Sequence, residues 1–301
     1  MLWGIDLGGT KIEGVVLKSA ENPEVLARMR IPTEQEHGYE HILSQISKLI
    51  GMMSKEVGAR PEKIGIGTPG TLDPQAQTLK NSNTTCYNGR PFITDLEQII
   101  KMPISIANDA NCFALAEAKM GAVKSQKIDA EVVFGVIMGT GVGGGLIVNG
   151  KIIGGKHGIG GEWGHNFLDE SGGECYCGKI GCVETVISGP FTQRYYESLS
   201  GQKKHLKEIV ELHKAGTDPN ATKTINRLTH FFGKAISVVI DIVDPDVVVI
   251  GGGVGNVDYL YTDGVQSARE FVFNDGLETT FLKPELGDSA GVFGAAMLVA
   301  D

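Results

Sequence analysis

The stretch IDLGGTKIEGVVL, Ile5–Leu17, decides the fold. A buried-strand pattern runs from Leu2 to Leu7, Gly8 and Gly9 make a turn, and a second apolar run continues from Ile12 to Leu17, which predicts a β-hairpin. The pattern returns between Ile137 and Val148, where the apolar run Val132–Met138 meets a glycine-rich turn and resumes through Val142–Val148. Two strand–glycine turn–strand units predict duplicated halves, each a mixed sheet with helices on its faces.

The rest of the chain alternates between apolar helices and short buried strands, as an α/β protein does. Helical spacing of apolar residues predicts helices over Tyr39–Val57, Ala110–Met120, Ile225–Val243 and Ala290–Ala300. Short apolar runs predict strands at Ile64–Ile66, Ile104–Ala107, Lys151–Ile153 and Val247–Ile250. With 301 residues, we expect a small lobe of residues 1–118 plus the helix 290–301, and a large lobe of residues 119–289. A ligand between two such lobes is the usual geometry.

Composition excludes several classes of protein. Glycine accounts for 42 residues, about twice the average use, and clusters between Gly135 and Gly181. The formal charge of −9, with no basic block, argues against nucleic-acid and anionic-membrane surfaces. No apolar stretch approaches the ~20 residues of a membrane span, and the N-terminus lacks a signal region. We therefore expect a cytoplasmic protein with no nucleic-acid or membrane partner.

Two glycine-rich turns are candidate phosphate-binding loops. The first is Asp6-Leu7-Gly8-Gly9-Thr10-Lys11, whose glycines let backbone N–H groups approach an anion while a hydroxyl and an ammonium add donors. It is not a Walker A motif. The second is Gly139-Thr140-Gly141-Val142-Gly143-Gly144-Gly145, between two apolar strands. A tight hairpin or a kink explains either turn alone, but one in each half predicts a pair that clamps the phosphates of a nucleotide.

Asn108 and Asp109 stand where a predicted strand ends and a predicted helix begins. Both residue types are good helix caps. A carboxylate at the end of a strand can also accept the proton of an attacking hydroxyl, which contributes about 10²–10⁴ in rate. The local sequence leaves the cap and the general base both open.

A cluster of soft ligands follows the second glycine-rich turn. His165, Cys175, Cys177 and Cys182 offer one imidazole and three thiols within a short glycine-rich stretch. This set suits a closed, tetrahedral, structural Zn²⁺, and buried free thiols or a redox pair are the alternatives. A closed site has no position for a metal-bound water, so zinc would shape the loop and take no part in catalysis.

These motifs, in this order, resemble those of the ROK (repressor, open reading frame, kinase) family of sugar kinases. The resemblance covers essentially the whole chain and is carried by Asp6–Lys11, Gly65-Ile66-Gly67-Thr68-Pro69-Gly70, Asn108-Asp109-Ala110-Asn111, Gly139–Gly145, Glu162-x-Gly164-His165, Cys175-x-Cys177-Gly178-x-x-Gly181-Cys182-x-Glu184, Asp244-Pro245-Asp246 and Gly251–Gly253.

The resemblance implies an α/β, two-lobed, actin-like ATPase (ribonuclease H-like) fold, with ATP-dependent phosphorylation of a hexose in the cleft between the lobes. Asp109 would be the base that deprotonates the sugar hydroxyl, and Asp6 would help to hold Mg²⁺ through water. The sugar hydroxyls would be bound by Asn108, Glu162, His165 and Glu184, with Gly70 and Asn83 lining the other side. ATP would be held by Gly4, Asp6, Gly8, Gly9, Thr10, Lys11, Gly139, Thr140, Gly141, Val142, Gly143, Gly144, Gly145, Gly252 and Gly253.

His165 would then both bind zinc and face the sugar, and a homodimer is the expectation for the family. The segments Asn83–Phe92 and Glu162–Asn166 look most like bacterial fructokinases and mannofructokinases, so a substrate of the fructose, mannose or glucose type is favoured. The alternative is an N-acetylglucosamine or N-acetylmannosamine kinase, because N-acetylglucosamine kinases share the Gly139–Gly145 loop. The phosphorylated hydroxyl, O6 or O1, stays open.

A different class is a sugar-sensing regulator without chemistry. Repressors of the family carry a helix-turn-helix before the segment that resembles Asp6–Lys11, whereas here a strand begins at Leu2. An intact Asp109 and two glycine-rich loops favour the kinase.

Overall fold

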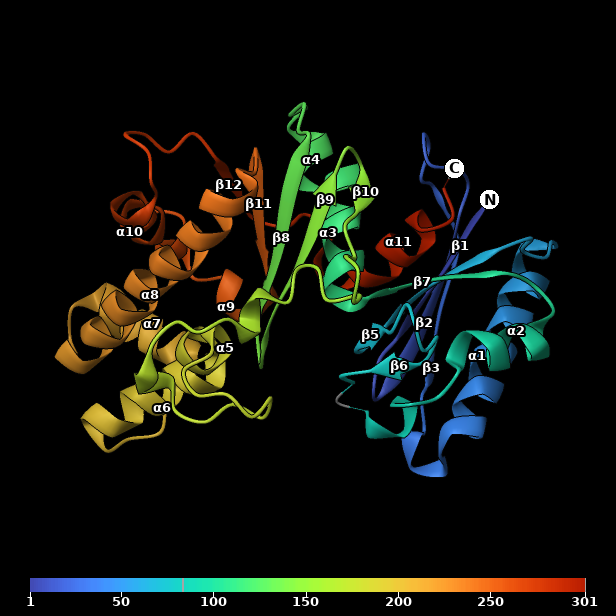
Figure 1. Cartoon of the computed structure of the whole chain (residues 1–301), viewed down its shortest axis with the longest axis horizontal. Helices are drawn as coiled ribbons and strands as arrows, with labels where there is room; N and C mark the ends of the chain where they lie inside the picture. Colours follow the sequence, from blue (N-terminus) through green and yellow to red (C-terminus); the bar gives the residue numbers. More distant parts are fainter. Residues whose placement is uncertain (83, 301) are drawn as a thin grey trace. The chain divides into compact units, whose positions relative to one another are not determined.

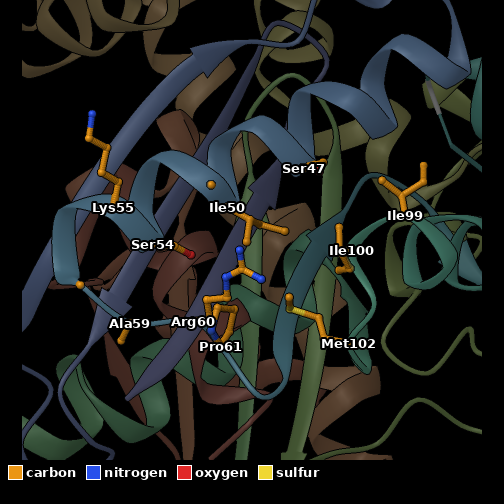
Figure 2. Close-up of a pocket in the computed structure, with 12 residues that line it drawn as sticks. Ser47, Ile50, Ser54, Lys55, Ala59, Arg60, Pro61, Ile99, Ile100 and Met102 are labelled. Atoms are coloured by element: carbon orange, nitrogen blue, oxygen red, sulfur yellow. The ribbon is translucent and has the colours of Figure 1, made fainter.

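The structure is a computed structural model that describes residues 1–82 and 84–300. The chain divides into two compact units, each built from more than one segment (Figure 1). Unit 1 comprises Met1–Lys127, Gly145–Gly160 and Glu285–Asp301, and unit 2 comprises Ile128–Gly144 and Gly161–Pro284. These units differ from the expected lobes in the segment Gly145–Gly160 and in their ends, so the lobes 1–118 with 290–301, and 119–289, remain a proposal.

The chain alternates between strands and helices throughout. The strands are β1 (Leu2–Leu7), β2 (Lys11–Leu17), β3 (Val25–Pro32), β4 (Ile64–Thr68), β5 (Thr71–Leu72), β6 (Leu79–Lys80), β7 (Ile104–Asn108), β8 (Val132–Met138), β9 (Val142–Val148), β10 (Lys151–Ile152), β11 (Val247–Gly251) and β12 (Thr280–Leu282). The α-helices are α1 (Tyr39–Val57), α2 (Phe92–Ile100), α3 (Asp109–Lys119), α4 (Ala122–Ser125), α5 (Val183–Ile187), α6 (Gly189–Ser200), α7 (Leu206–Ala215), α8 (Pro219–Val243), α9 (Gly252–Gly255), α10 (Asp263–Phe271) and α11 (Ala290–Met297). Short 3₁₀ helices lie at Gln35–His37, Thr85–Tyr87, Trp163–His165, Glu170–Gly172, Asp258–Leu260 and Gly287–Ser289.

Two five-stranded sheets follow the same plan, as the repeated sequence pattern predicts. In the order β3-β2-β1-β4-β7, β1 pairs antiparallel with β2, and β4 and β7 continue the sheet in parallel. In the order β10-β9-β8-β11-β12, β10 pairs antiparallel with β9, and β11 and β12 continue in parallel from β8. β5 and β6 form a separate two-stranded sheet.

Alternation along β1 decides which helix covers which face of the first sheet. Trp3, Ile5 and Leu7 point into a core shared with α1. The residues between them point to the opposite face, where a Cβ on Gly4 would lie 2.3 Å from the backbone nitrogen of Ala296 in α11. Figure 1 shows α1 and α11 on opposite sides of this sheet. Glycine at position 4 therefore lets α11 pack directly on the strand.

In unit 2, several helices pack against the long helix α8. The Asp218 carboxylate accepts hydrogen bonds from the N–H groups of Asn220 and Ala221, and Pro219 occupies the first turn, so the helix begins there. The apolar face of α8 packs against α10, α6 and α7. β11 is buried along its whole length between β8 and β12. No helix in the described part of the chain is long and apolar enough to cross a membrane.

Most of the predicted elements are confirmed, several with the predicted bounds. β1, α1, β8 and β9 begin and end where the sequence predicts. The edge strand β3 was not predicted, and neither were the short helices around the cysteine cluster or the strand β12. The predicted final helix is shorter and ends at Met297.

Candidate active site

Unit 1 contains a pocket of about 450 Å³ where β1, the first glycine-rich turn and the start of α3 meet. Asp6 and Asp109 both line it. The other lining residues are Leu7, Gly8, Gly9, Thr10, Gln35, Pro69 and Thr84. The family resemblance implies that Asp6, Asp109 and the turn belong to one site, and the structure brings them together. Gln35, Pro69 and Thr84 also line the pocket and were not expected there, although Pro69 lies in the quoted motif around Gly70.

The structure shows a cap at Asn108 and places Asp109 at the pocket. The side-chain oxygen of Asn108 accepts the N–H of Asn111 at 2.8 Å, so Asn108 is the N-cap of α3. Asp109 is the first residue of α3, and its Oδ1 accepts the N–H of Ala110 at 2.8 Å. Asp109 is therefore fixed at a helix N-terminus while its carboxylate is exposed to the pocket.

The surroundings of the two carboxylates raise the pKa of both. Asp109 opens to the pocket on one side but is densely enclosed by protein on the others, and this desolvation raises its pKa. Desolvation also raises the pKa of Asp6 to about 6, with further contributions from the charges of Asp109 and Glu13. Lys11 and Arg30 act in the opposite direction. Two carboxylates with raised pKa values in one pocket are typical of a functional site.

Glu13 is an acidic neighbour of Asp6 that the sequence analysis missed. It lies opposite Asp6 in the β1–β2 register, and its side chain is 2% exposed. Arg30 pairs with its Oε2 at 2.8 Å, and Arg28, which also hydrogen-bonds Ser289, pairs with Oε1. A glutamate inside an otherwise apolar strand was the signal in the sequence.

The first glycine-rich turn is held from outside by Thr33. Gly8 donates its N–H to the carbonyl of Lys11 at 3.0 Å and closes the turn. Thr33, which is fully buried, donates its hydroxyl to the carbonyl of Gly8 and its N–H to the carbonyl of Thr10. A Cβ on Gly9 would have only the Thr84 and Gln35 side chains near it, at 3.4 and 3.6 Å. Gly9 is thus the open position of this turn.

The glycines of the second turn serve different purposes. A Cβ on Gly144 would lie 2.7 Å from the Trp163 ring, and one on Gly145 would lie 2.7 Å from the carbonyl of Ala110, so both are needed for packing. At Gly141 a Cβ would lie 2.5 Å from Oε2 of Glu184. At Gly139 a Cβ would fit, because the nearest atom, the nitrogen of Gly253, would lie 3.9 Å away. At Gly141, Gly144 and Gly145 a side chain would therefore meet protein atoms.

Hydrogen bonds from unit 2 fix the backbone of the second turn. Gly139 donates its N–H to the carbonyl of Gly141 at 2.9 Å, and Gly189 donates to the carbonyl of Gly139 at 2.9 Å. The indole of Trp163 donates to the carbonyl of Gly143 at 3.0 Å. Val142 donates its N–H to the Glu184 carboxylate at 3.0 Å. Thr140 remains exposed at the tip.

The remaining predicted residues divide between the units. Gly70 lies in unit 1 with φ +80°, and a Cβ there would lie 2.6 Å from the carbonyl of Lys80. Asn83 lies outside the described residues. In unit 2, Gly252 has φ +80° and Gly253 has open space around it. Gly4 is buried beneath α11 and not in the pocket lining.

The cysteine cluster is assembled as the spacing predicts. One ligand atom from each of His165, Cys175, Cys177 and Cys182 lies within 4.8 Å of the others. The Cys177 and Cys182 sulfurs are 3.6 Å apart, and Sγ of Cys175 is 3.6 Å from Nδ1 of His165. With Zn–S bonds of about 2.3 Å, tetrahedral ligands stand about 3.8 Å apart. The donor set and its spacing fit a tetrahedral metal ion.

The second nitrogen of His165 points away from the cysteines. Its Nε2 lies 3.0 Å from the Tyr176 hydroxyl, and the two rings meet edge to face. Tyr176, between two of the cysteines, is 77% exposed. The negative charges of Glu184 and Glu162 help to raise the pKa of Tyr176 to about 12, after the larger effect of desolvation. Tyr176 therefore lies among the unit 2 residues predicted to bind sugar.

Comparison with known proteins agrees with this geometry. The model of the ROK family matches residues 2–301. An N-acetyl-D-glucosamine kinase of Aliivibrio fischeri is 35% identical over 308 residues, which cover 99% of each chain. The crystal structure of a ROK hexokinase from Thermus thermophilus is 31% identical, with a TM-score of 0.86, and covers 99% of this chain and 97% of that one.

A ROK family glucokinase from Streptomyces griseus, solved with glucose and AMPPNP, is 27% identical, with a TM-score of 0.76. The match covers 99% of this chain and 98% of that one. The likeness to these structures confirms the expected α/β, actin-like ATPase fold. With a family model that spans residues 2–301, this chain belongs to the ROK family.

Proposed function

We propose that this chain is an ATP-dependent sugar kinase that transfers the γ-phosphate of ATP to a hydroxyl of N-acetylglucosamine. The observation that carries the proposal is the pocket in unit 1, which places Asp109 and Asp6 beside the Gly8–Gly9 turn. Phosphoryl transfer needs little covalent chemistry from the protein beyond positioning, charge stabilisation and acceptance of one proton. The pocket supplies groups for each of these.

Asp109 is the residue that accepts the proton. The sugar hydroxyl forms a bond to the γ-phosphorus, the bond from that phosphorus to the bridging oxygen of ADP breaks, and the hydroxyl proton moves to the Asp109 carboxylate. Because the N-terminus of α3 fixes Asp109, its orientation does not depend on the substrate. Its raised pKa makes it a stronger base than an ordinary aspartate.

Further residues would hold the metal ion and the substrates. Asp6, half-buried at the pocket wall, would hold Mg²⁺ through water, and the ion would neutralise phosphate charge. Backbone N–H groups and the Thr10 hydroxyl would bind phosphate in unit 1. The residues that would bind the sugar hydroxyls are Asn108, Glu162, His165 and Glu184.

The names of the relatives support an N-acetylated sugar. Several N-acetyl-D-glucosamine kinases are 33–35% identical over almost the full length of both chains. Of the substrates that the sequence left open, this supports the N-acetylglucosamine alternative better than the fructose or mannose type. The Thermus thermophilus hexokinase and the Streptomyces griseus glucokinase leave glucose as the second candidate.

The test is ADP release with MgATP and a panel of N-acetylglucosamine, N-acetylmannosamine, glucose, fructose and mannose. We expect the highest kcat/KM with N-acetylglucosamine, and phosphorus NMR of the product identifies the phosphorylated hydroxyl. A higher kcat/KM with fructose would contradict the proposed substrate. If sugars of the panel bind but none of them causes ADP release, the chain would instead be a sugar-sensing regulator.

The cysteine cluster is proposed to hold one structural Zn²⁺. Its support is the set of three sulfurs and one imidazole at tetrahedral spacing, with no fifth donor needed. Metal analysis of the purified protein is expected to give about one zinc per chain, and replacement of Cys182 by serine is expected to lower that content. A zinc content near zero in protein purified without chelators would contradict the proposal.

Two further expectations concern the assembly and the location of the chain. We propose a homodimer, which sedimentation of the purified chain would detect. We also propose a cytoplasmic location, because the reaction draws on ATP.

A further inference from the structure

Glu184 connects the cysteine cluster to the second glycine-rich turn, and we propose that it is a positioning residue for the nucleotide loop. One oxygen of its carboxylate shapes the turn that takes ATP phosphate, and the other remains for the sugar. The two substrates would thereby be coupled through a single side chain. This inference rests on the proposed sugar kinase function.

The position of Glu184 is set by the cysteine cluster. Cys182 is the N-cap of α5, and Glu184 lies in the first turn of that helix. The fold of the segment before it brings Cys182 within 3.6 Å of Cys177. A metal at this cluster would therefore fix the start of α5 and the direction of the Glu184 side chain. Glu184 follows the ligand Cys182 by only two residues.

The contact with the turn is direct. Oε2 of Glu184 accepts the N–H of Val142, the residue at which the turn enters β9, at 3.0 Å. A hydrogen bond to an ionised acceptor is stronger than one between neutral groups. Oε1 has no hydrogen-bond partner among the residues that the structure describes. The carboxylate is half-buried, so this second oxygen can reach a ligand.

The glycine at position 141 provides independent support. A Cβ there would lie 2.5 Å from Oε2 of Glu184, closer than real Cβ contacts come. Position 139, in the same turn, would accept a Cβ with no close atom. A side chain at position 141 would therefore displace the Glu184 carboxylate, and backbone bending does not require the glycine, since its φ is not positive. Glycine at this position leaves room for Glu184 to reach Val142.

Coupling follows from the shared carboxylate. A sugar hydroxyl bound at Oε1 restricts the rotation of the Glu184 side chain and so restricts Oε2 and the turn. A turn that is ordered before the nucleotide arrives loses less conformational entropy on binding. Each substrate would then raise the affinity for the other by the same factor.

The experiment measures the dissociation constant of MgAMPPNP by calorimetry, with and without saturating N-acetylglucosamine. For the natural chain we expect several-fold tighter nucleotide binding when sugar is present. In Glu184→Ala we expect nucleotide binding about tenfold weaker without sugar, and no gain when sugar is added. Glu184→Gln, whose amide oxygen can still accept the Val142 N–H, is expected to bind nucleotide nearly normally.

The matched control is Glu174→Ala, which removes the same charge from an exposed position of the same segment. Its nucleotide affinity is expected to equal that of the natural chain. A Glu184→Ala variant that binds MgAMPPNP as tightly as the natural chain without sugar would overturn the proposal. Absence of nucleotide binding by the natural chain would instead overturn the proposed function.

A double-mutant cycle separates this role from a general loss of structure. Gly141→Ala is expected to weaken nucleotide binding in the natural background, because the new Cβ displaces the carboxylate. In the Glu184→Ala background the same change should have little effect, since no carboxylate is left to displace. Additive effects of the two changes would contradict the proposed contact. If Glu184→Ala does not fold, Glu184→Asp takes its place in the cycle, because its shorter side chain leaves room for the Cβ at position 141 and does not reach Val142.

Discussion

The environment of Asp109 disfavours its ionised form, which makes the carboxylate more basic and destabilises the folded chain. Desolvation raises its pKa, which means that the ionised form is less favourable in the folded chain than in the unfolded chain. Asp109→Asn removes this charge, and the amide oxygen can still accept the N–H of Ala110. We expect kcat to fall by about 10²–10⁴, with sugar binding retained and a melting temperature equal to or above that of the natural chain. Calorimetry of unfolding checks the second part, and a clearly lower melting temperature would contradict it.

The raised pKa values of Asp109 and Asp6 also predict how kcat/KM falls at acidic pH. A general base works only when ionised, so kcat/KM falls as the pH is lowered through the pKa of Asp109, which desolvation raises above its ordinary value. Asp6, with a pKa of about 6, becomes neutral in the same direction and loses its attraction for Mg²⁺. The measurement is kcat/KM for the sugar between pH 5 and 8 at saturating MgATP. A kcat/KM that stays constant down to pH 5 would contradict the raised pKa of Asp6.

We expect Tyr176 to compete with the sugar for His165. Its hydroxyl lies 3.0 Å from Nε2, the nitrogen that the cysteine cluster leaves available. Tyr176→Phe keeps the ring contact and removes only the hydroxyl. Because one such hydrogen bond contributes about 1 kcal/mol, we expect the KM for sugar to fall up to about fivefold, with kcat and zinc content unchanged. A KM that rises would mean that the hydroxyl helps to bind the sugar.

Among the elements, α11 depends on glycine in the first sheet. A Cβ on Gly65 of β4 would lie 1.8 Å from the carbonyl oxygen of Ala295. Helix α11 can therefore pack on this sheet only if position 65 has no side chain. Gly65→Ala is expected to destabilise the chain by about 1–3 kcal/mol or more. The matched control is Gly51→Ala in α1, which meets no atom within 4 Å and should stabilise the helix by up to about 1 kcal/mol. Urea unfolding of both variants measures the difference, and similar effects would contradict the packing argument.

Elements with a clear period could be predicted from the sequence, whereas edge elements could not. α1 and β1 have strong apolar periodicity and were placed to the residue. β3 was missed because it is an edge strand whose exposed positions include Arg28 and Arg30, and its apolar pattern is weak. Thr33 and Gln35 follow that strand, so their part in the first site was missed with it. A single sequence does not contain the long-range contacts that bring such residues together.

The glycine excess illustrates the same limit within the second turn. Glycine marked the right segment, but its reason at each position lies in residues distant in sequence, such as Glu184 for Gly141 and Trp163 for Gly144. Gly139 alone of these has the open space that a ligand would need. The glycine content predicts that other atoms approach the backbone closely in this segment. Only the fold shows which atoms these are.

At the scale of the whole molecule, each unit has its own core, and the cysteine cluster belongs to unit 2 alone. The core of unit 1 is built from β1, β2, α1 and their neighbours and contains no residue of the cluster. The segment from Glu162 to Glu184 consists mainly of turns, short 3₁₀ helices and isolated bridges, and it contacts the second turn through Trp163 and Glu184. Stability should therefore depend on the metal in one unit and not in the other.

Removal of zinc is the change that tests this division. Metal binding couples to the folding of small sites, so chelation is expected to increase hydrogen exchange in residues 161–188 and in the turn 139–142, which Glu184 and Gly189 hold. Peptides from α1 and β1 should keep their protection, because their core contains no metal ligand. Hydrogen-exchange mass spectrometry of the zinc-loaded and the chelated chain measures this, with zinc added back as the control. Equal loss of protection in both units would mean that the metal supports the whole molecule, and no loss in residues 161–188 would mean that the cysteine cluster holds its shape without a metal.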